Sequence, residues 1–453
     1  MKILLLGSGG REHAFAHQLS KSPNCERLYI APGNGGTGDC GENVSLAVDD
    51  FPAIAHFCLE QGIQMIVPAS EAPLVAGIYD YFLADEQLAS IAVIGPSKAA
   101  AQLEGSKAFA KAFMERNAIP TAGYREFTVS ELEEGKRYLE GQTLPIVLKA
   151  DGLAAGKGVV ICASVDEAKQ EMEEMLASAK FGAAGSKVVV EDFLTGIECS
   201  VFVLTDGEHY RLLPTAKDYK RIGEGDTGLN TGGMGAVSPV PFADAVFMEK
   251  VERTIILPTI AGLRKEELVY KGFIYFGLMK VGDTPYVIEY NCRMGDPETE
   301  AVLPRITSDL VTEFEKVAAG NLETKPLEVC AEGAVTIVLA SKGYPEAFEK
   351  EKEIKLASIP AGGFVFHAGT KLVDGKLLSN GGRVLMVTSL DKDLREALRK
   401  TRKKIDQLKD KSEHIERSVV PEAKSQNEIM KLCTKLLDDC KSEKTRALDK
   451  KYD

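Results

Sequence analysis

The chain has 453 residues, 44% of them hydrophobic and 27% charged, and a formal net charge of −12. These values are typical of a globular protein with several domains. The negative charge argues against a general nucleic-acid binder, because no cationic field would attract phosphate backbones. No apolar run approaches the length of a membrane-spanning helix. The nine cysteines include no CxxC pair, which favours reduced thiols in a cytoplasmic protein.

The N-terminal part of the chain predicts a doubly wound α/β domain. The expected elements are buried strands at 2–6, 64–67 and 91–94 and a helix at 11–21. The turn between the first strand and the helix presents backbone N–H groups and a positive dipole end to an anion. The turn does not match the dinucleotide fingerprint, since the third glycine position holds Glu12. An NAD-dependent dehydrogenase is therefore disfavoured.

Glu71 follows the predicted strand at 64–67, at the edge where ligands bind in doubly wound sheets. A carboxylate there suits paired sugar hydroxyls, because it accepts two hydrogen bonds. A structural role fits the local sequence equally well: Glu71 would then begin a helix, where the helix dipole favours an acidic residue.

Residues 149–160 predict a glycine-rich hairpin between apolar strands. The hairpin is not a Walker A loop, because only three residues separate Gly152 from Gly156 and no Ser or Thr follows Lys157. With Lys149 at the end of the preceding strand, the hairpin can fold over a polyphosphate, and each charge-assisted contact would contribute about 1.5–3 kcal/mol. The alternative is an ordinary β-turn with a solvated lysine.

The segment 188–194 predicts a strand whose end, at 192–194, leaves backbone groups available. Such groups can bind the edge of an adenine, and Glu198 can hold ribose hydroxyls. The glycine-dense segment 226–235 predicts a loop, because so many glycines disfavour the interior of a helix or strand. Its backbone N–H groups could approach a ligand closely.

Polar side chains follow an apolar strand predicted at 285–288. Glu289, Asn291 and Arg293 are spaced two residues apart, so on a strand they share one face. Carboxylate and amide oxygens suit Mg²⁺, which binds through one or two protein groups and substrate phosphates. Arg293 can hold a carboxylate or phosphoryl oxygen in a fork. The alternative is a strand end with solvated polar residues.

Taken together, these segments closely resemble the phosphoribosylamine–glycine ligase family, whose members are ATP-grasp enzymes. The resemblance rests on an ordered set of motifs: GSGGREHA (7–14), APGNGGT (31–37), EAPLVAG (71–77), QLEGSKAF (102–109), KADGLAAGKGV (149–159), DYKR (218–221), NTGGMGA (230–236), EYNCRMGDPETE (289–300), FHAGTK (366–371) and GGRVL (381–385). Each motif alone is weakly specific, whereas the ordered set over residues 1–390 is very specific.

The resemblance implies an α/β multi-domain fold. The expected parts are an N-terminal doubly wound α/β domain (1–103), an ATP-grasp core (104–122 and 189–327), an inserted lid (123–188), a small C-terminal α+β domain (328–421) and a charged extension (422–453). The extension is expected to be helical, since Ile429, Leu432, Leu436 and Cys440 recur at helical spacing.

The family reaction joins glycine to 5-phosphoribosylamine through a glycyl phosphate, with ATP as co-substrate. Its products are glycinamide ribonucleotide, ADP and phosphate, in de novo purine biosynthesis. We accordingly expect a monomer whose partners are small molecules, with no nucleic acid and no membrane among them.

The resemblance also assigns roles residue by residue. Glu289 and Asn291 would bind Mg²⁺ or Mn²⁺. ATP would be bound by Lys107, Lys149, Gly156, Lys157, Glu191, Asp192, Phe193, Leu194 and Glu198, the residues 191–194 acting through their backbone. The catalytic residues would be Arg293, Asp296 and Lys220. Phosphoribosylamine would be bound by Gly10, Glu71, Asp296, Lys371 and Arg383, although Arg383 could instead be an ordinary surface residue of a strand.

The chain departs from the family pattern at Ser70, Lys217, Leu229, Met294 and Ser418–Val420. These departures keep two alternatives open, namely an ATP-grasp enzyme with another acyl or amine substrate and a non-catalytic nucleotide-binding protein. No departure removes a charged ligand named above, which argues against loss of activity.

Overall fold

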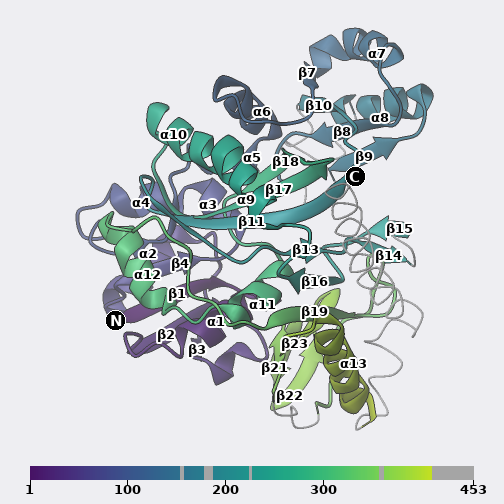
Figure 1. The fold of residues 1–453 in the computed structure, drawn as a ribbon. Coiled ribbons are helices and arrows are strands. Elements are labelled where there is room, and N and C mark those ends of the chain that lie inside the picture. The colour runs from purple at the N-terminus through teal and green to yellow at the C-terminus, as the bar shows by residue number, and fades with distance from the viewer. Residues whose placement is uncertain (154–157, 178–186, 224–226, 357–361, 411–453) are drawn as a thin grey trace, which may run out of the picture.

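The computed structural model describes residues 1–153, 158–177, 187–223, 227–356 and 362–410 (Figure 1). The predicted ligands Gly156 and Lys157, the departure at Ser418–Val420 and the extension 422–453 lie outside the described residues. Within the described ranges, no helix combines the length and the apolarity that a membrane crossing requires.

The N-terminal part contains a five-stranded parallel sheet in the order β3-β2-β1-β4-β5. Its strands are β1 (Lys2–Gly7), β2 (Arg27–Pro32), β3 (Glu42–Asn43), β4 (Met65–Pro68) and β5 (Ala92–Val93). Its helices are α1 (Gly10–Leu19), the 3₁₀ turn η1 (Thr37–Asp39), α2 (Phe51–Gln61), α3 (Glu71–Ala76) and α4 (Ile78–Leu83). The strand order reverses between β1 and β4, so the loops after these two strands meet at a topological switch point, where ligands bind in such sheets.

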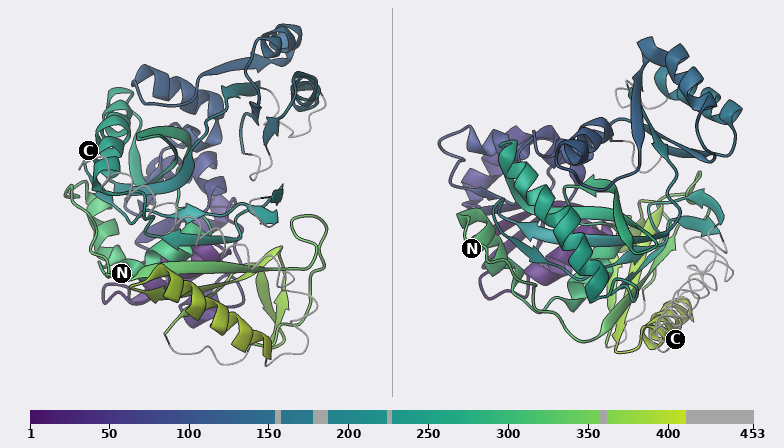
Figure 2. Two further views of the ribbon diagram at one scale, coloured as in Figure 1. Left: turned by 45° about the vertical axis from the view of Figure 1, so that its right-hand side comes forward. Right: turned by 45° about the horizontal axis from the view of Figure 1, so that its top comes forward.

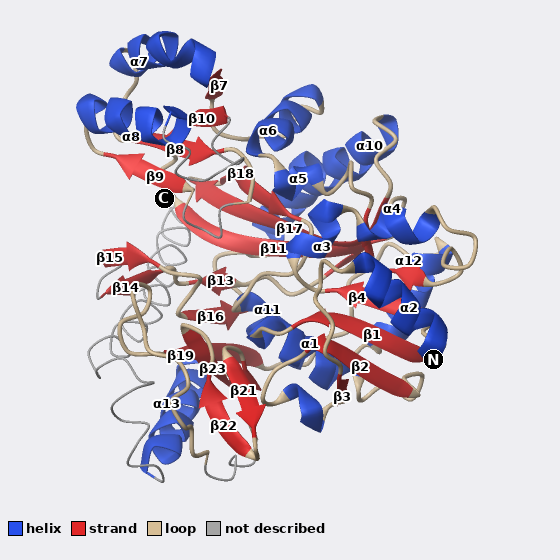
Figure 3. Cartoon of the chain, turned by 180° about the vertical axis from the view of Figure 1, so that it is seen from behind, coloured by secondary structure: helices blue, strands red, loops and turns tan. Residues whose placement is uncertain are grey.

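A four-stranded antiparallel sheet forms the lid, in the order β7-β10-β8-β9. Its elements are β7 (Tyr124–Thr128), η2 (Val129–Glu131), α7 (Leu132–Glu140), β8 (Ile146–Ala150), β9 (Val159–Cys162), α8 (Val165–Ala177) and β10 (Lys187–Asp192). The strands β8 and β9 are the two arms of the predicted hairpin. The lid has its own core around Phe127, Leu148 and Met172. Figure 2 shows the lid projecting from the rest of the molecule, and Figure 3 shows α7 and α8 on one side of its sheet.

The central sheet has the order β12-β11-β17-β18, and β6 pairs with β17. Its strands are β6 (Gly95–Pro96), β11 (Ile197–Thr205), β12 (Tyr210–Leu212), β17 (Tyr270–Val281) and β18 (Thr284–Asn291). The neighbouring helices are α5 (Gln102–Gly105), α6 (Lys107–Arg116), α9 (Ala245–Val251), the π-helix η4 (Glu252–Ile256) and α10 (Leu257–Lys265). The register shifts where Gly277 faces Glu289 and Leu278 faces Val287, so Ile288 is the extra residue of a bulge.

The C-terminal part shares a sheet with the segment before it, in the order β13-β16-β19-β23-β20. Its strands are β13 (Lys217–Asp218), β16 (Gly235–Ser238), β19 (Gly333–Ala340), β20 (Phe364–His367) and β23 (Arg383–Asp391). The remaining elements are α11 (Glu298–Val302), η5 (Leu303–Arg305), α12 (Leu310–Ala319), the hairpin β21 (Thr370–Val373) and β22 (Lys376–Ser379), and α13 (Leu394–Asp410).

The N-terminal and C-terminal parts are joined by hydrogen bonds between buried groups. The backbone N–H of His367 donates to Nδ1 of His13 at 2.8 Å, and the side-chain amide of Asn34 donates to the carbonyl of His367 at 2.7 Å. These contacts join α1 and the loop after β2 to β20. The predicted fold class, a doubly wound domain followed by an ATP-grasp core with a lid and a small C-terminal domain, is confirmed.

One prediction about local structure is wrong. The segment 226–235 was expected to be a loop, whereas β15 (Thr227–Asn230) pairs with β14 (Arg221–Gly223) and β16 begins at Gly235. Every residue of β15 is exposed, so no hydrophobic alternation marks it in the sequence. Gly228 lies at the irregularity between the paired residues Thr227 and Asn230, where its φ of 80° favours glycine.

Candidate active site

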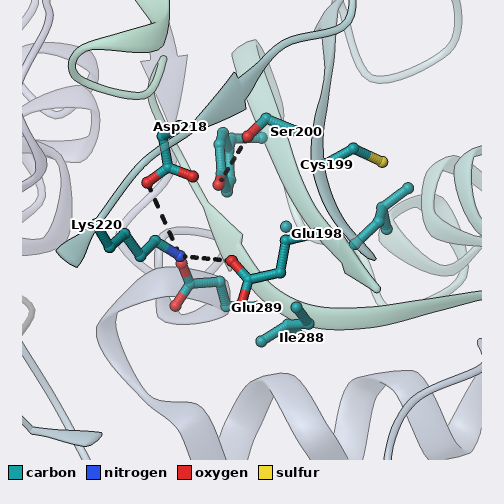
Figure 4. A pocket seen from close by; sticks show the side chains of 10 residues that line it. Glu198, Cys199, Ser200, Asp218, Lys220, Ile288 and Glu289 are labelled. Carbon is teal, nitrogen blue, oxygen red and sulfur yellow. Dashed lines mark hydrogen bonds and ion pairs between the residues drawn. The ribbon is translucent and has the colours of Figure 1, made fainter. Parts of the chain in front are cut away.

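A pocket lies where β11, β13, β17 and β18 meet, and acidic residues line much of it. Lys220 Nζ lies 3.2 Å from Glu198 Oε2 and 4.0 Å from Asp218 Oδ2. Figure 4 shows the Lys220 ammonium between these two carboxylates, with the carboxylate of Glu289 beside it. One cation among three carboxylates leaves the pocket with a surplus of negative charge, which favours binding of a further cation.

Lys220 favours the ionised forms of Glu198 and Asp218, although burial still raises the pKa of Asp218. The negative charge of Asp218 raises the pKa of Lys220 well above its usual value and outweighs the effect of desolvation. Lys220 in turn lowers the pKa of Glu198, against the opposing effect of burial. The site therefore presents a firmly protonated ammonium group beside an ionised carboxylate.

The proposed metal ligands lie at the end of β18. Glu289 lines the pocket, and Asn291, the last residue of the strand, pairs in register with Tyr275. In the described parts of the chain, no cluster of three His, Cys, Asp or Glu side chains could hold a metal by itself. A pair of hard oxygen ligands nevertheless fits Mg²⁺, because this ion commonly takes most of its ligands from water and substrate phosphates.

Two of the predicted phosphate-binding lysines lie on neighbouring elements, Lys107 on α6 and Lys149 on β8. Lys107 Nζ donates to the carbonyl of Gly152 at 2.8 Å, and Lys149 Nζ donates to the carbonyl of Ile288 at 3.1 Å. Burial lowers the pKa of Lys107, and Glu289 opposes this change. Both ammonium groups thus lie next to the hairpin β8–β9 and near the carboxylate proposed to bind the metal.

Glu191 lies between two buried lysines, and one of them was not predicted. Its carboxylate contacts Lys149 Nζ at 2.9 Å and Lys111 Nζ at 3.2 Å. Burial lowers the pKa of Lys111 to about 8. Lys111 lies four residues after Lys107 on α6, and this helical spacing was the only signal of it in the sequence.

The strand β10 ends at Asp192, the first residue of the predicted strand end at 192–194, but the backbone of Asp192 is itself still paired. The backbone of Glu191 is paired on both sides, with β7 and with β8, and the N–H of Asp192 donates to the carbonyl of Gly123 at 2.9 Å. Phe193 and Leu194 lie beyond the strand, and the Phe193 side chain is exposed. Four residues, 191–194, were proposed to bind adenine through their backbone. Phe193 and Leu194 are the two whose backbone groups take no part in the pairing of the lid sheet.

Arg293 lies just beyond the end of β18 and is held by two carboxylates. Its Nε lies 3.3 Å from Glu71 Oε2, and its Nη2 lies 2.9 Å from Glu104 Oε1. Burial would lower the pKa of Arg293, but the two carboxylates outweigh this effect and raise it. Glu71 is the first residue of α3, as the structural alternative predicted, and it also contacts Arg293. Glu104 was missed, because its partner lies far away in the sequence.

Besides Glu71, the residues proposed for phosphoribosylamine are Gly10, Asp296 and Arg383, which lie near one another, and Lys371. Asp296 Oδ1 lies 2.9 Å from Arg383 Nη1, which also donates to the carbonyl of Gly232 at 2.6 Å. Gly10 begins α1 close by, because a Cβ on its neighbour Gly9 would lie 3.5 Å from Asp296 Oδ2. Lys371, by contrast, lies on β21 and pairs with Glu351 at 2.7 Å.

Solved structures identify the class to which this fold belongs. The biotin carboxylase domain of the 2-oxoglutarate carboxylase from Hydrogenobacter thermophilus, solved with MgADP, ADP and bicarbonate, matches with a TM-score of 0.69 over 89% of both chains. It is only 16% identical, so the likeness concerns the fold alone. The family model of the phosphoribosylglycinamide synthetase ATP-grasp (A) domain matches residues 105–299. The fold and its pocket therefore define an ATP-grasp protein.

The N and C domain models of the same synthetase match residues 1–104 and 334–417. The phosphoribosylamine–glycine ligase of Agrobacterium fabrum is 48% identical over 400 residues, which cover 88% of this chain and 92% of that protein. The ligase of Pasteurella multocida is 46% identical over 394 residues, which cover 86% of this chain and 90% of that protein. The ligase structure from Thermotoga maritima has a TM-score of 0.78 and 36% identity, covering 90% of this chain and 96% of that one. The chain belongs to the phosphoribosylamine–glycine ligase family, and the resemblance drawn from its motifs is confirmed.

Proposed function

We propose that this ATP-grasp ligase joins glycine to 5-phosphoribosylamine, with ATP as co-substrate, in purine biosynthesis. The products would be glycinamide ribonucleotide, ADP and phosphate. The observation that carries the proposal is the match of all three family domains in order along the chain. The pocket of Glu198, Asp218, Lys220 and Glu289 supports it, because it joins a protonated lysine to a surplus of carboxylates.

The first step would convert glycine into glycyl phosphate, because an ionised carboxylate is a poor electrophile. Transfer of a phosphoryl group depends mainly on alignment and charge neutralisation. Lys107 and Lys149, together with Lys157, would bind the ATP phosphates, and Glu198 the nucleotide ribose. Mg²⁺, or Mn²⁺ in its place, would be held by Glu289 and Asn291 and would neutralise phosphate charge. Arg293 would steady the transferred group.

In the second step the amine of phosphoribosylamine would attack the carbonyl carbon, and phosphate would leave. The ion pair of Asp296 with Arg383 lies close to the start of α1. A 5-phosphate bound at Gly10 would therefore meet the positive end of a helix and a guanidinium group together. Asp296 would orient the amine, and Glu71 the ribose.

The test is phosphate release from ATP, with glycine and freshly generated phosphoribosylamine added separately and together. Release that requires both substrates, with formation of glycinamide ribonucleotide, is the expected result. Release with another acyl or amine substrate, but not with this pair, would favour a different ATP-grasp ligase. Folded protein that binds ATP and releases phosphate under no condition would favour the non-catalytic alternative.

We also propose that the enzyme acts as a cytoplasmic monomer without a nucleic-acid partner. The net charge of −12 supports the absence of a nucleic-acid partner. Every cysteine in the described ranges is a free thiol, as expected in a reducing compartment. Light scattering at micromolar concentration would test the association state, since a dimer would double the measured mass.

A further inference from the structure

Glu104 is a buried carboxylate to which the proposed reaction gives no role. It lies on α5, three residues before Lys107, and its side chain is 5% exposed. Both of its oxygens are used: Oε1 contacts Arg293 Nη2 at 2.9 Å, and Oε2 accepts hydrogen bonds from the backbone N–H of Cys292 at 2.8 Å and from its thiol at 3.0 Å. One side chain thereby fixes two successive residues at the end of β18.

The guanidinium of Arg293 is held on three sides. Besides Glu104, Glu71 lies 3.3 Å from its Nε, and its Nη1 donates to the carbonyl of Met294 at 3.2 Å. An arginine side chain has many rotamers, so fixing it before the reaction lowers the entropy that has to be lost in the transition state. These contacts therefore give Arg293 one defined orientation.

The two carboxylates that hold Arg293 differ in what surrounds them. Glu71 also lies 3.9 Å from Arg11 Nη2, and Arg11 pairs with Glu12 at 2.7 Å. Glu12 in turn accepts a hydrogen bond from the N–H of Gly9 at 2.5 Å, in the turn proposed to bind the 5-phosphate. Glu71 is thus connected to the proposed phosphoribosylamine site, whereas the hydrogen bonds and the ion pair of Glu104 are made with Cys292 and Arg293, just beyond β18. If Glu71 binds the ribose as proposed, Glu104 is the carboxylate that remains free to hold Arg293.

We propose that Glu104 is a positioning residue that keeps the guanidinium of Arg293 aligned with the reacting groups at the end of β18. The inference rests on the role proposed for Arg293. Among the proposed metal and substrate ligands in the described ranges, Arg293 is the one that Glu104 contacts at ion-pair distance, although its charge also acts on Lys107 and Glu71. A purely structural ion pair is the competing explanation, but buried ion pairs are weak sources of stability compared with apolar side chains of similar size.

The first test is Glu104→Gln. Glutamine keeps the shape of the side chain, but its NH₂ group must face either the N–H of Cys292 or Nη2 of Arg293, and both of these are donors. We expect kcat to fall by more than about tenfold, while the affinity for MgADP and the KM for ATP stay within about twofold of the wild type. Cys292→Ala, which removes only the thiol contact, should keep kcat within about threefold. Glu266→Gln, which breaks the pair with Arg116 on α6, is the matched control at another Arg–Glu pair and should have no effect.

A double-mutant cycle separates positioning from general support of the fold. If Glu104 acts through Arg293, adding Glu104→Gln to Arg293→Gln should lower kcat no further than Arg293→Gln alone. Wild-type kcat in Glu104→Gln, additive losses in the double variant, or a parallel loss of MgADP affinity would each overturn the proposal. If Glu104→Gln does not fold, Glu104→Asp, which keeps the charge on a shorter stem, should show a smaller loss confined to kcat. Equal losses of kcat and MgADP affinity in that variant would likewise overturn it.

A spectroscopic measurement keeps this inference separate from the proposed reaction. The NMR signal of the Arg293 Nε–H can be assigned by its loss in Arg293→Gln. In Glu104→Gln this signal should shift, and its proton should exchange faster with water, regardless of which substrates the enzyme uses. An unchanged signal would overturn the positioning role. Wild-type protein without ligase activity would overturn the proposed reaction instead, and the signal would still report whether Glu104 holds Arg293.

Discussion

Single side chains in the candidate site derive their chemistry from partners that the fold brings next to them, some close in the sequence and some distant. Lys220 is kept protonated by Asp218 and Glu198, which come from two different strands. The charged ligands themselves could be recognised from their motifs, because residue type and spacing carry that information. Their partners could not, since the contact of Glu104 with Arg293 depends on how α5 packs against the end of β18.

Glu289→Gln should remove a charged metal ligand while leaving the fold intact. Glu289 is only partly buried and lines the pocket, so a neutral side chain of the same shape can replace it without leaving a void. We expect kcat to fall by more than about a hundredfold, because the metal loses its anionic ligand from the protein. Raising the Mg²⁺ concentration should restore part of the activity by mass action. Steady-state phosphate release, with thermal unfolding as a control, measures both effects, and wild-type turnover in the variant would refute the metal assignment.

Arg383→Ala should weaken the binding of phosphoribosylamine and leave ATP unaffected. Arg383 lies with Asp296 near the start of α1, so its removal takes away a charge-assisted contact with the 5-phosphate. Such a contact contributes about 1.5–3 kcal/mol, which corresponds to an increase in KM of about 10- to 100-fold. Arg27→Ala, which breaks an exposed pair with Glu42, is the matched control. Equal increases in the KM for both substrates would argue against a specific phosphate contact.

Among the secondary-structure elements, those with a buried apolar run were predictable and those without one were not. The apolar residues of β1, Ile3 to Leu6, are buried on both faces, and the strand ends at Gly7, one residue beyond the predicted end. The bulge at Ile288 and the exposed hairpin β14–β15 leave no hydrophobic pattern in the sequence. The same holds in the candidate site. The ends of its strands could be predicted from the sequence, whereas the bulge next to Glu289 could not, because it depends on how β18 pairs with β17.

Gly10→Ala tests whether the start of α1 requires close packing. A Cβ at Gly10 would overlap Met386 Sδ and come within 2.5 Å of Glu300 Oε1, and both atoms belong to buried residues. Overpacking of this kind costs about 1–3 kcal/mol, so we expect a lower free energy of unfolding and a higher KM for phosphoribosylamine. Gly38→Ala is the matched control, since nothing lies within 4 Å of its added Cβ. Denaturant unfolding of the two variants gives the comparison, and equal stabilities would contradict the packing argument.

For the whole molecule, the arrangement of the domains could be predicted only through the family resemblance. The sheet β13-β16-β19-β23-β20 takes strands from both sides of the boundary expected at 327–328. Pairing of this kind depends on contacts between residues 100 or so positions apart, such as Gly235 with Ile337, for which local patterns carry no signal. The N-terminal and C-terminal parts also meet at His13 and His367, two buried residues that lie in the quoted motifs but whose contact the motifs do not predict.

This junction should make the stability of the protein depend on pH. Desolvation lowers the pKa of His13 to about 3 and that of His367 to about 4. In the folded protein His13 accepts a hydrogen bond at Nδ1, so it is neutral there. Between these values and the ordinary pKa near 6.5, the unfolded chain binds more protons than the folded one, so the stability is fully present above about pH 6.5 and falls as the pH is lowered toward 4.

His13→Asn should therefore flatten the acid side of the stability profile. Asparagine can offer an acceptor near the position of Nδ1 but has no ring to protonate, so the slope of the free energy of unfolding should decrease by up to about 1.4 kcal/mol per pH unit between pH 6.5 and 4. At pH 8 the variant should be no more stable than the wild type. Urea unfolding at a series of pH values measures the slope, with His56→Asn on the surface as the control. An unchanged slope in His13→Asn would mean that the contact between the N-terminal and C-terminal parts is not the acid-sensitive element.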